Sequence, residues 1–335
     1  MIELKTLLLA GVTTLAMAVA PAVAQDKVSF GTDWLAQAEH GGFYQAVADG
    51  TYAEHGLDVT IVPGGPQAAN RSLLIAGRID FYMGGVLSAL DSVKEGIPMV
   101  TVASFFQKDP QVLMTHPDAG YETFADLANA EKIILGKDVL VTKFEWMKAN
   151  FEGFSDEQYV PYTYNTAPFL ADPQAVQQGY VTSEPFAIEQ QGGFTPKVFL
   201  FADEGYNAYS TTMETSQKLV DENPDLVQRF VDASIIGWYN YLYGDNAAAN
   251  ELIKQDNPDM TDEQLAYSLE KLKEYGIVDS GDAQEMGIGC ITEERYGDFF
   301  QKLASIGLYE EDLEWQKAID TRFVCKGVGM ELAEG

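Results

Sequence analysis

Short apolar runs alternate with amphipathic stretches through the first half of the chain after its N-terminal segment. The runs have the length of buried strands and lie at residues 28–32, 58–62 and 79–83. The stretches between them have helical spacing and lie at residues 41–49, 66–76 and 86–95. Each predicted helix is followed by a glycine, which is typical of a helix C-terminus. This alternation predicts a mostly parallel sheet flanked by helices.

A second block of the same kind begins after His116-Pro117, and a helical region follows it. The block has predicted helices at 123–128, 139–151 and 166–179 and predicted strands at 132–135, 160–164 and 197–202. Apolar or extended connecting segments lie at 99–106, 112–115 and 206–212. From Glu214 onward the pattern is almost entirely helical, with predicted helices at 225–243, 261–275 and from Thr292 onward.

Two strand–helix blocks joined by two extended crossings predict an α/β fold with two lobes. We expect the crossings near 113–117 and 204–209. Lobe one would then comprise residues 26–113 and 208–335, with the C-terminal helices packed around it, and lobe two residues 114–207. Since open α/β folds collect ligands at the carboxyl ends of their strands, the cleft between the lobes is the expected binding site.

The N-terminus has the composition of an export signal. Lys5 precedes an apolar run from Leu7 to Ala20, and Ala22-Val23-Ala24 forms a small-x-small cleavage site. The run is too short for a good membrane span. We therefore expect a signal peptide of residues 1–24, cleaved near Ala24, and a periplasmic protein; a retained N-terminal anchor is the alternative.

Charge and cysteine usage narrow the class of protein further. The chain has 335 residues, 46% of them hydrophobic, and a net charge of −30. This charge argues against nucleic acid and anionic membrane surfaces as partners. Cys290 and Cys325 are the two cysteines, and in an exported chain such a pair indicates a disulfide, here one that ties down the C-terminal tail.

The common catalytic motifs are absent from the sequence. There is no Gly-x-Ser-x-Gly elbow, no Walker loop and no metal-type spacing of His or Cys, and Gly64-Gly65 and Gly84-Gly85 are too short to be dinucleotide loops. We therefore expect a monomeric binding protein without catalytic residues, metal or cofactor.

A family resemblance lies in the stretch from Gly31 to Gly85. The matching positions are Asp33, Trp34, His40, Gly42, Tyr44 and Gly56-Leu57-Asp58-Val59. The stretch resembles the periplasmic binding proteins of ABC importers that handle the thiamine pyrimidine precursor, whose relatives take sulfonates, taurine or nitrate. The resemblance implies a two-lobed periplasmic-binding-protein clamshell (type II-like) over essentially the whole mature chain, and an ABC permease and ATPase as membrane partners.

Four candidate ligand-binding residues of lobe one follow the first predicted strand. Trp34 could stack on a flat ligand or pack in the core. Asp33 could accept a hydrogen bond from a ligand N–H or cap the following loop. His40 and Gly42 stand at a predicted helix start, where free amides favour an acceptor group on the ligand; His40 could instead donate to a carbonyl.

Three further candidates of lobe one follow later strands. Gly84 and Gly85 would let a ligand approach the backbone and would free amides at the start of helix 86–95, unless they serve close strand–helix packing. Gln107 follows an apolar strand and is a candidate for an amide contact or a simple turn residue.

Lobe two contributes a carboxylate and a group of aromatic residues. Glu184 lies in Gly-Tyr-Val-Thr-Ser-Glu-Pro-Phe (179–186) at a predicted helix start. A carboxylate there could pair with an aminopyrimidine edge, as the resembled family implies, or simply stabilise the helix dipole. The other candidates are Tyr162, Tyr164, Asn165 and Tyr206.

These residues favour a small, flat, nitrogenous heterocycle of the pyrimidine type as the ligand. If Arg71 or Lys137 faces the cleft, the alternative of a taurine, alkyl sulfonate or nitrate anion becomes stronger. A pyrimidine synthase is the alternative of another class, since His40 resembles a histidine of the related eukaryotic enzymes, but the cysteine cluster of those enzymes is missing. A sensory protein that presents a ligand to a receptor is a third possibility.

Overall fold

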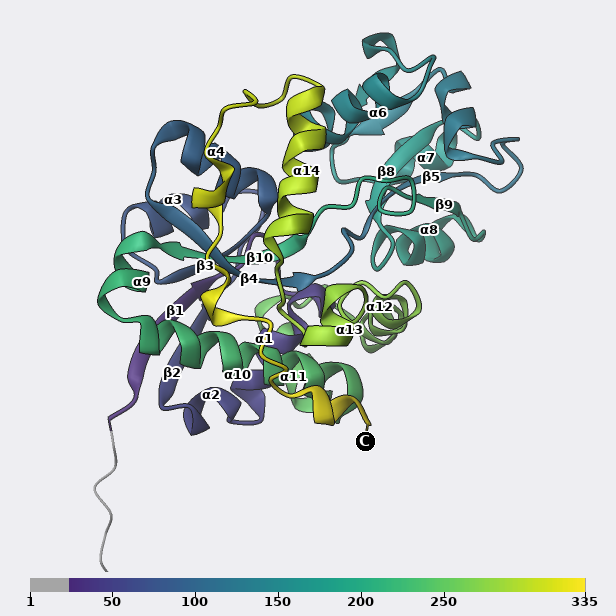
Figure 1. Cartoon of the computed structure of the whole chain (residues 1–335). Helices are drawn as coiled ribbons and strands as arrows, with labels where there is room; N and C mark the ends of the chain where they lie inside the picture. Colours follow the sequence, from purple (N-terminus) through teal and green to yellow (C-terminus); the bar gives the residue numbers. More distant parts are fainter. Residues whose placement is uncertain (1–23, 335) are drawn as a thin grey trace, which may run out of the picture.

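Two five-stranded sheets form the framework of the molecule (Figure 1). The computed structural model describes residues 24–334, so the expected signal peptide lies almost wholly outside the described residues. The first sheet has the order β2-β1-β3-β10-β4 and consists of β1 (Asp26–Gly31), β2 (Leu57–Val62), β3 (Phe81–Gly84), β4 (Met99–Phe106) and β10 (Ser210–Ser216). The second has the order β7-β6-β8-β5-β9 and consists of β5 (Gln111–Thr115), β6 (Ile133–Leu135), β7 (Tyr159–Pro161), β8 (Val176–Tyr180) and β9 (Lys197–Leu200). We call the parts built on these sheets lobe one and lobe two.

Helices cover both sheets. Those of lobe one are α1 (Gly41–Ala48), α2 (Thr51–Glu54), α3 (Asn70–Ile75), α4 (Val86–Glu95), α9 (Gln217–Glu222), α10 (Pro224–Tyr243) and α11 (Ala247–Asp256). Those of lobe two are α5 (Lys137–Val139), α6 (Glu145–Asn150), α7 (Ala167–Ala171) and α8 (Glu184–Gly192). The C-terminal part adds α12 (Asp262–Glu274), α13 (Asp282–Met286) and α14 (Glu293–Ser305). The two-lobed α/β architecture predicted from the sequence is confirmed.

Both sheets are mixed, because each receives one reversed strand. β1 is parallel to β2 and β3, but β10 is antiparallel to its neighbours β3 and β4. In the same way β5 is antiparallel to its neighbours β8 and β9. β5 and β10 are the first strands after each passage between lobes. The other four strands of each sheet share one direction, so the expected mostly parallel sheets are confirmed, with one reversed strand in each that the sequence pattern did not reveal.

The first crossing lies earlier than predicted. Leu113 pairs with Gln178 of β8 and Phe199 of β9, so all of β5 belongs to the second sheet. A boundary after residue 113 would cut this strand. The sheets place the crossings at residues 107–110 and 201–209.

The predicted helix 166–179 is wrong beyond Ala171. Pro173 cannot donate an intrahelical hydrogen bond, and the residue before a proline avoids the helical region. Asp172 is accordingly extended, with φ −124° and ψ 97°, and it ends α7. The chain after it forms β8, which pairs with β5 and β6. Glu214, expected at the start of the helical region, lies within β10.

The C-terminal helices contact both lobes, whereas we expected them around lobe one. In α12, the Ser268 hydroxyl donates to the carbonyl of Thr182 in lobe two at 2.6 Å. In α14, the Phe299 ring lies 5.0 Å from the ring of Tyr206, between centroids, at the second crossing. Figure 1 shows α12 and α14 between the lobes. Both helices therefore support the cleft. Within residues 24–334, no helix is long and apolar enough to cross a membrane.

Cys290 and Cys325 form the predicted disulfide, which ties the C-terminal tail to the segment before α14. The two residues are 35 positions apart. The double variant Cys290→Ser/Cys325→Ser is expected to lose about 3–4 kcal/mol of unfolding free energy, because the unfolded chain regains loop entropy. Urea unfolding of the oxidised protein and of the variant measures this difference. Equal midpoints would show that the bond does not stabilise the fold.

Candidate functional site

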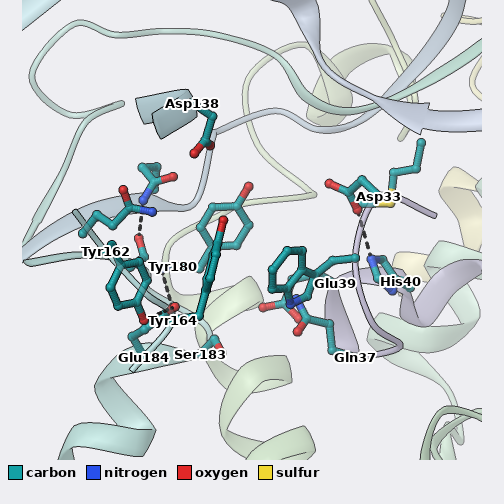
Figure 2. A pocket seen from close by; sticks show the side chains of 15 residues that line it. Asp33, Gln37, Glu39, His40, Asp138, Tyr162, Tyr164, Tyr180, Ser183 and Glu184 are labelled. Atoms are coloured by element: carbon teal, nitrogen blue, oxygen red, sulfur yellow. Dashed lines mark hydrogen bonds and ion pairs between the residues drawn. The ribbon is translucent and has the colours of Figure 1, made fainter. Parts of the chain in front are cut away.

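One cavity of about 190 Å³ lies between the two lobes, at the ends of their strands (Figure 2). Lobe one lines it with Asp33, Trp34, Gln37, Glu39, His40 and Met83. Lobe two lines it with Gln111, Asp138, Tyr162, Tyr164, Gln178, Gly179, Tyr180, Ser183 and Glu184. This is the cleft edge at which α/β folds bind their ligands.

Half of the twelve predicted ligand-binding residues come together at this cavity. They are Asp33, Trp34 and His40 from lobe one and Tyr162, Tyr164 and Glu184 from lobe two. Figure 2 shows Asp33 and His40 on the side of the cavity opposite Tyr162, Tyr164 and Glu184. Strand ends far apart in the sequence thus meet at one place, as the sequence pattern predicted.

Gly42, Gly84 and Gly85 lie outside the cavity lining. Gly42 lets α1 pack closely on α10, since a β-carbon there would overlap Trp238. A β-carbon on Gly84 would overlap the carboxylate of Glu214. Gly85 is the N-cap residue of α4. Gly84 therefore makes room for a protein group, whereas a β-carbon on Gly85 would meet open space.

Gln107, Asn165 and Tyr206 also lie outside the lining. Buried Gln107 donates to the carbonyl of Cys290 at 3.0 Å and accepts from Arg295 at 2.9 Å. Asn165 accepts from the Ala167 amide at the start of α7. Tyr206 is buried against aromatic rings of lobe two and α14. All three hold loops or crossings together.

The N-terminus of α4 is occupied by the chain's own carboxylate. The Ser88 hydroxyl donates to Glu214, and the Gly85 amide donates to the Ser88 oxygen at 3.1 Å. We expected free amides here, open to a ligand acceptor. Because Glu214 takes this position, the helix terminus does not offer an open anion site.

Two aromatic rings meet across the cleft, one from each lobe. The ring centroids of Trp34 and Tyr164 are 5.0 Å apart, and Tyr162 lies behind Tyr164 at 5.2 Å. Tyr164 is 57% exposed, so the pair stands at the outer edge of the cavity. Tyr164 also has a positive φ of 56°. A left-handed backbone at a bulky residue is strained, and such strain is concentrated at functional sites.

Glu184 is half-buried and keeps accepting capacity for a further donor. Its Oε2 accepts from the Tyr180 amide at 2.7 Å, and its Oε1 lies 3.4 Å from the Tyr162 hydroxyl. Each carboxylate oxygen can accept two hydrogen bonds. Withdrawal from water raises the pKa of Glu184, and the nearby charge of Glu39 adds to this effect.

Glu39 is 2% exposed and links the lobes. The Thr182 hydroxyl of lobe two donates to its carboxylate, and burial raises the pKa of Glu39. The adjacent His40 is also buried; its Nε2 lies 3.4 Å from Asp33 Oδ1, and its Nδ1 has no hydrogen-bond partner. The cavity wall therefore holds polar groups with unused bonding capacity.

Several lining residues escaped prediction. Asp138 lies in α5, three residues after β6 ends at Leu135, and this position near a strand end could have been found from the sequence. Gln178 and Gly179 were hidden by the wrong prediction of a helix over 166–179, and Tyr180 directly follows that range. Glu39 and Gln37 carry no strand-end signal, because they lie in and before the single turn η1 (Ala38–His40).

Among the described residues, 24–334, those that line the cavity include four carboxylates and neither lysine nor arginine. The two cations that could have favoured an anion are outside it. Arg71 donates to the carbonyl of Ser88 and the hydroxyl of Ser92, and Lys137 is exposed. The site is therefore acidic and aromatic.

Known proteins resemble this chain over nearly its whole length. The riboflavin-binding protein RibY of Chloroflexus aurantiacus is 23% identical over 312 residues, covering 90% of this chain and 87% of RibY. The alkanesulfonate-binding protein SsuA of Xanthomonas axonopodis matches with a TM-score of 0.62 and 13% identity, covering 90% of this chain and 100% of SsuA.

An enzyme shares the fold as well. The desulfurization enzyme DszB, solved with biphenyl-2-sulfinic acid, matches with a TM-score of 0.61 and 13% identity, covering 89% of this chain and 97% of DszB. These structures confirm the periplasmic-binding-protein fold. The sequence profile described as NMT1/THI5 like matches residues 37–248, more than half of the sequence, and the chain therefore belongs to the NMT1/THI5-like family.

Proposed function

We propose that this protein is the exported solute-binding component of an ABC importer, and that its ligand is a small, flat, nitrogenous heterocycle of the pyrimidine type. The observation that carries the proposal is the interlobe cavity, which combines aromatic rings with carboxylates and lacks a lining lysine or arginine. Membership of the family and the naming of SsuA and RibY as small-molecule binding proteins support the general role.

The chemistry of the lining suits a ring with N–H groups at its edge. Trp34 and the tyrosines offer faces for stacking. Glu184 and Glu39 accept hydrogen bonds. The volume of about 190 Å³ is smaller than the ~300–1,000 Å³ usual for drug-sized ligands, which favours a single ring in this arrangement.

The remaining parts of the proposal concern compartment and motion. We expect a periplasmic, monomeric protein whose lobes close by a hinge motion at the crossings 107–110 and 201–209. The membrane permease and its ATPase would receive the closed, loaded form.

A melting-shift screen tests the ligand class. The compounds are aminopyrimidines, riboflavin, taurine, an alkyl sulfonate and nitrate. We expect the aminopyrimidines to raise the melting temperature. A shift only with riboflavin would indicate that the cavity opens for a fused ring, and shifts only with the anions would refute the ligand class. Conversion of any compound to a product would favour an enzyme, as in DszB.

Replacement of Trp34 by alanine is expected to weaken binding of the pyrimidine about 5- to 30-fold. The variant loses the stacking face and its buried area, together about 1–2 kcal/mol. Trp34→Phe keeps a ring and should lose much less. Isothermal titration calorimetry measures both, and unchanged affinity of Trp34→Ala would show that the indole does not touch the ligand.

A further inference from the structure

The lobes bring acidic groups to the same cavity from opposite sides. Asp33 and Glu39 belong to lobe one, and Asp138 and Glu184 belong to lobe two. Building on the function proposed above, we infer that the ligand binds as a cation, and that its positive charge is what permits the two acidic lobe surfaces to close.

Glu39 and Glu184 form the inner pair of carboxylates. They are the strongest support for a cationic ligand, because their charges are withdrawn from water. Glu39 is buried, Glu184 is half-buried, and the charge of Glu39 is among the causes that raise the pKa of Glu184. Carboxylates that share a site disfavour each other's ionisation. Closure without compensation therefore costs free energy, and either protonation or a cation offsets it.

The exposed rim of the cavity is also negatively charged. Asp33 and Asp138 are exposed, and both line the cavity. His40 is the one basic side chain of the lining, and its Nε2 already faces Asp33. The acidic lining therefore exceeds what the protein itself can neutralise inside the cavity.

Within residues 24–334, the surroundings of the inner pair supply hydrogen bonds but no basic side chain apart from His40. Glu39 is approached by Asp33 and His40 from its own segment and by Thr182 from lobe two. Behind it, α10 contributes the neutral phenol of Tyr241. From α12, Tyr267 and Ser268 donate to the carbonyls of Val181 and Thr182.

The groups around Glu184 are likewise without a cation. They are the Tyr180 amide, the Tyr162 hydroxyl and the carboxylate of Glu39. The tyrosine rings of the cavity add a preference for positive charge, since a cation is attracted to an aromatic face. A flat cation would thus satisfy both the carboxylates and the rings of Trp34 and Tyr164.

A matched pair of probes tests this inference directly. The permanent cation 4-amino-1-methylpyridinium and its uncharged isostere p-toluidine have the same shape. At about pH 8 we expect calorimetry to show that the cation binds at least about tenfold more tightly than the isostere. Equal or tighter binding of p-toluidine would overturn the inference.

The lining carboxylates should account for the tighter binding of the cation than of p-toluidine. Glu39→Gln and Asp138→Asn are each expected to weaken binding of the cation about fivefold or more and to weaken binding of p-toluidine less, so that the preference for the cation falls. Glu189→Gln, on the same helix as Glu184 but outside the lining, is the control and should change neither. Binding of the cation should strengthen as pH rises from about 5 to about 8, because the raised pKa values of Glu39 and Glu184 shift the loss of their protons toward neutral pH. Weakening over this range would refute the inference.

Lobe closure gives an independent readout by small-angle X-ray scattering. The ligand-free protein at about pH 8 should be more extended than the protein with 4-amino-1-methylpyridinium, and Glu39→Gln/Asp138→Asn should be compact without it. Compact ligand-free wild-type protein at this pH would contradict the proposal. If uncharged pyrimidines bind and the cation does not, this inference fails alone; if no heterocycle binds, the proposed function fails with it.

Discussion

Replacement of Glu184 by glutamine is expected to weaken binding of the pyrimidine ligand about 10- to 150-fold. Hydrogen bonds to an ionised carboxylate contribute about 1.5–3 kcal/mol, and the substitution removes the charge from the one carboxylate at the start of α8. The glutamine oxygen can still accept from the Tyr180 amide, which Glu184 contacts at 2.7 Å. The local backbone should therefore persist. Calorimetry with the best compound of the melting-shift screen measures the loss.

Glu189→Gln is the matched control for this substitution. It makes the same chemical change on the same helix, but Glu189 does not line the cavity. The affinity of the Glu189→Gln variant for the pyrimidine ligand should equal that of the wild-type protein. If Glu184→Gln also binds as the wild type does, Glu184 serves only the hydrogen bond to Tyr180 and the start of α8, and the ligand lies elsewhere in the cavity.

The local pattern predicted the layers of the fold but not the reversed strands. The run from β1 through α4 alternates by short connections, so its parallel strands follow from right-handed crossovers. Insertion of β10 between β3 and β4 depends on pairing across more than a hundred residues. Nothing in residues 210–216 indicates that partner. The long-range pairing, rather than the propensity of the segment, decides its structure.

The same contrast between local position and long-range contact explains which residues of the candidate site could be predicted from the sequence. Trp34 and Glu184 stand next to strands or helix starts, and this local position predicted that they would face the cleft. Glu39 becomes part of the cavity only when lobe two brings Thr182 against it. Tyr206 has the chemistry of a ligand contact but is buried by Trp146 and Phe299, which residue type alone does not reveal.

The second large effect is expected from a substitution of Glu214, which should change the stability of the fold rather than ligand binding. Its side chain is 0% exposed, and its Oε2 has no hydrogen-bond partner. Burial raises its pKa from 4.5 to about 7, although the Ser88 hydroxyl and the charge of Arg71 oppose the shift. At neutral pH the folded protein therefore holds a costly buried carboxylate, which it uses to fill the start of α4.

Replacement of Glu214 by glutamine is accordingly expected to stabilise the protein at about pH 8. Because the folded pKa is raised, the stability linked to this group is complete below about pH 4.5 and is lost as pH rises through about 7, a loss of about 3 kcal/mol. The variant lacks this loss, so the difference between variant and wild type in urea unfolding should grow by about 3 kcal/mol from about pH 4.5 to about pH 8. Glu222→Gln, at the exposed end of α9, should show no such growth. If the difference in unfolding free energy between Glu214→Gln and the wild type does not change with pH, ionisation of the buried carboxylate does not destabilise the fold. Gly85, Ser88 and Arg71 would then compensate fully for the hydration that Glu214 loses on burial.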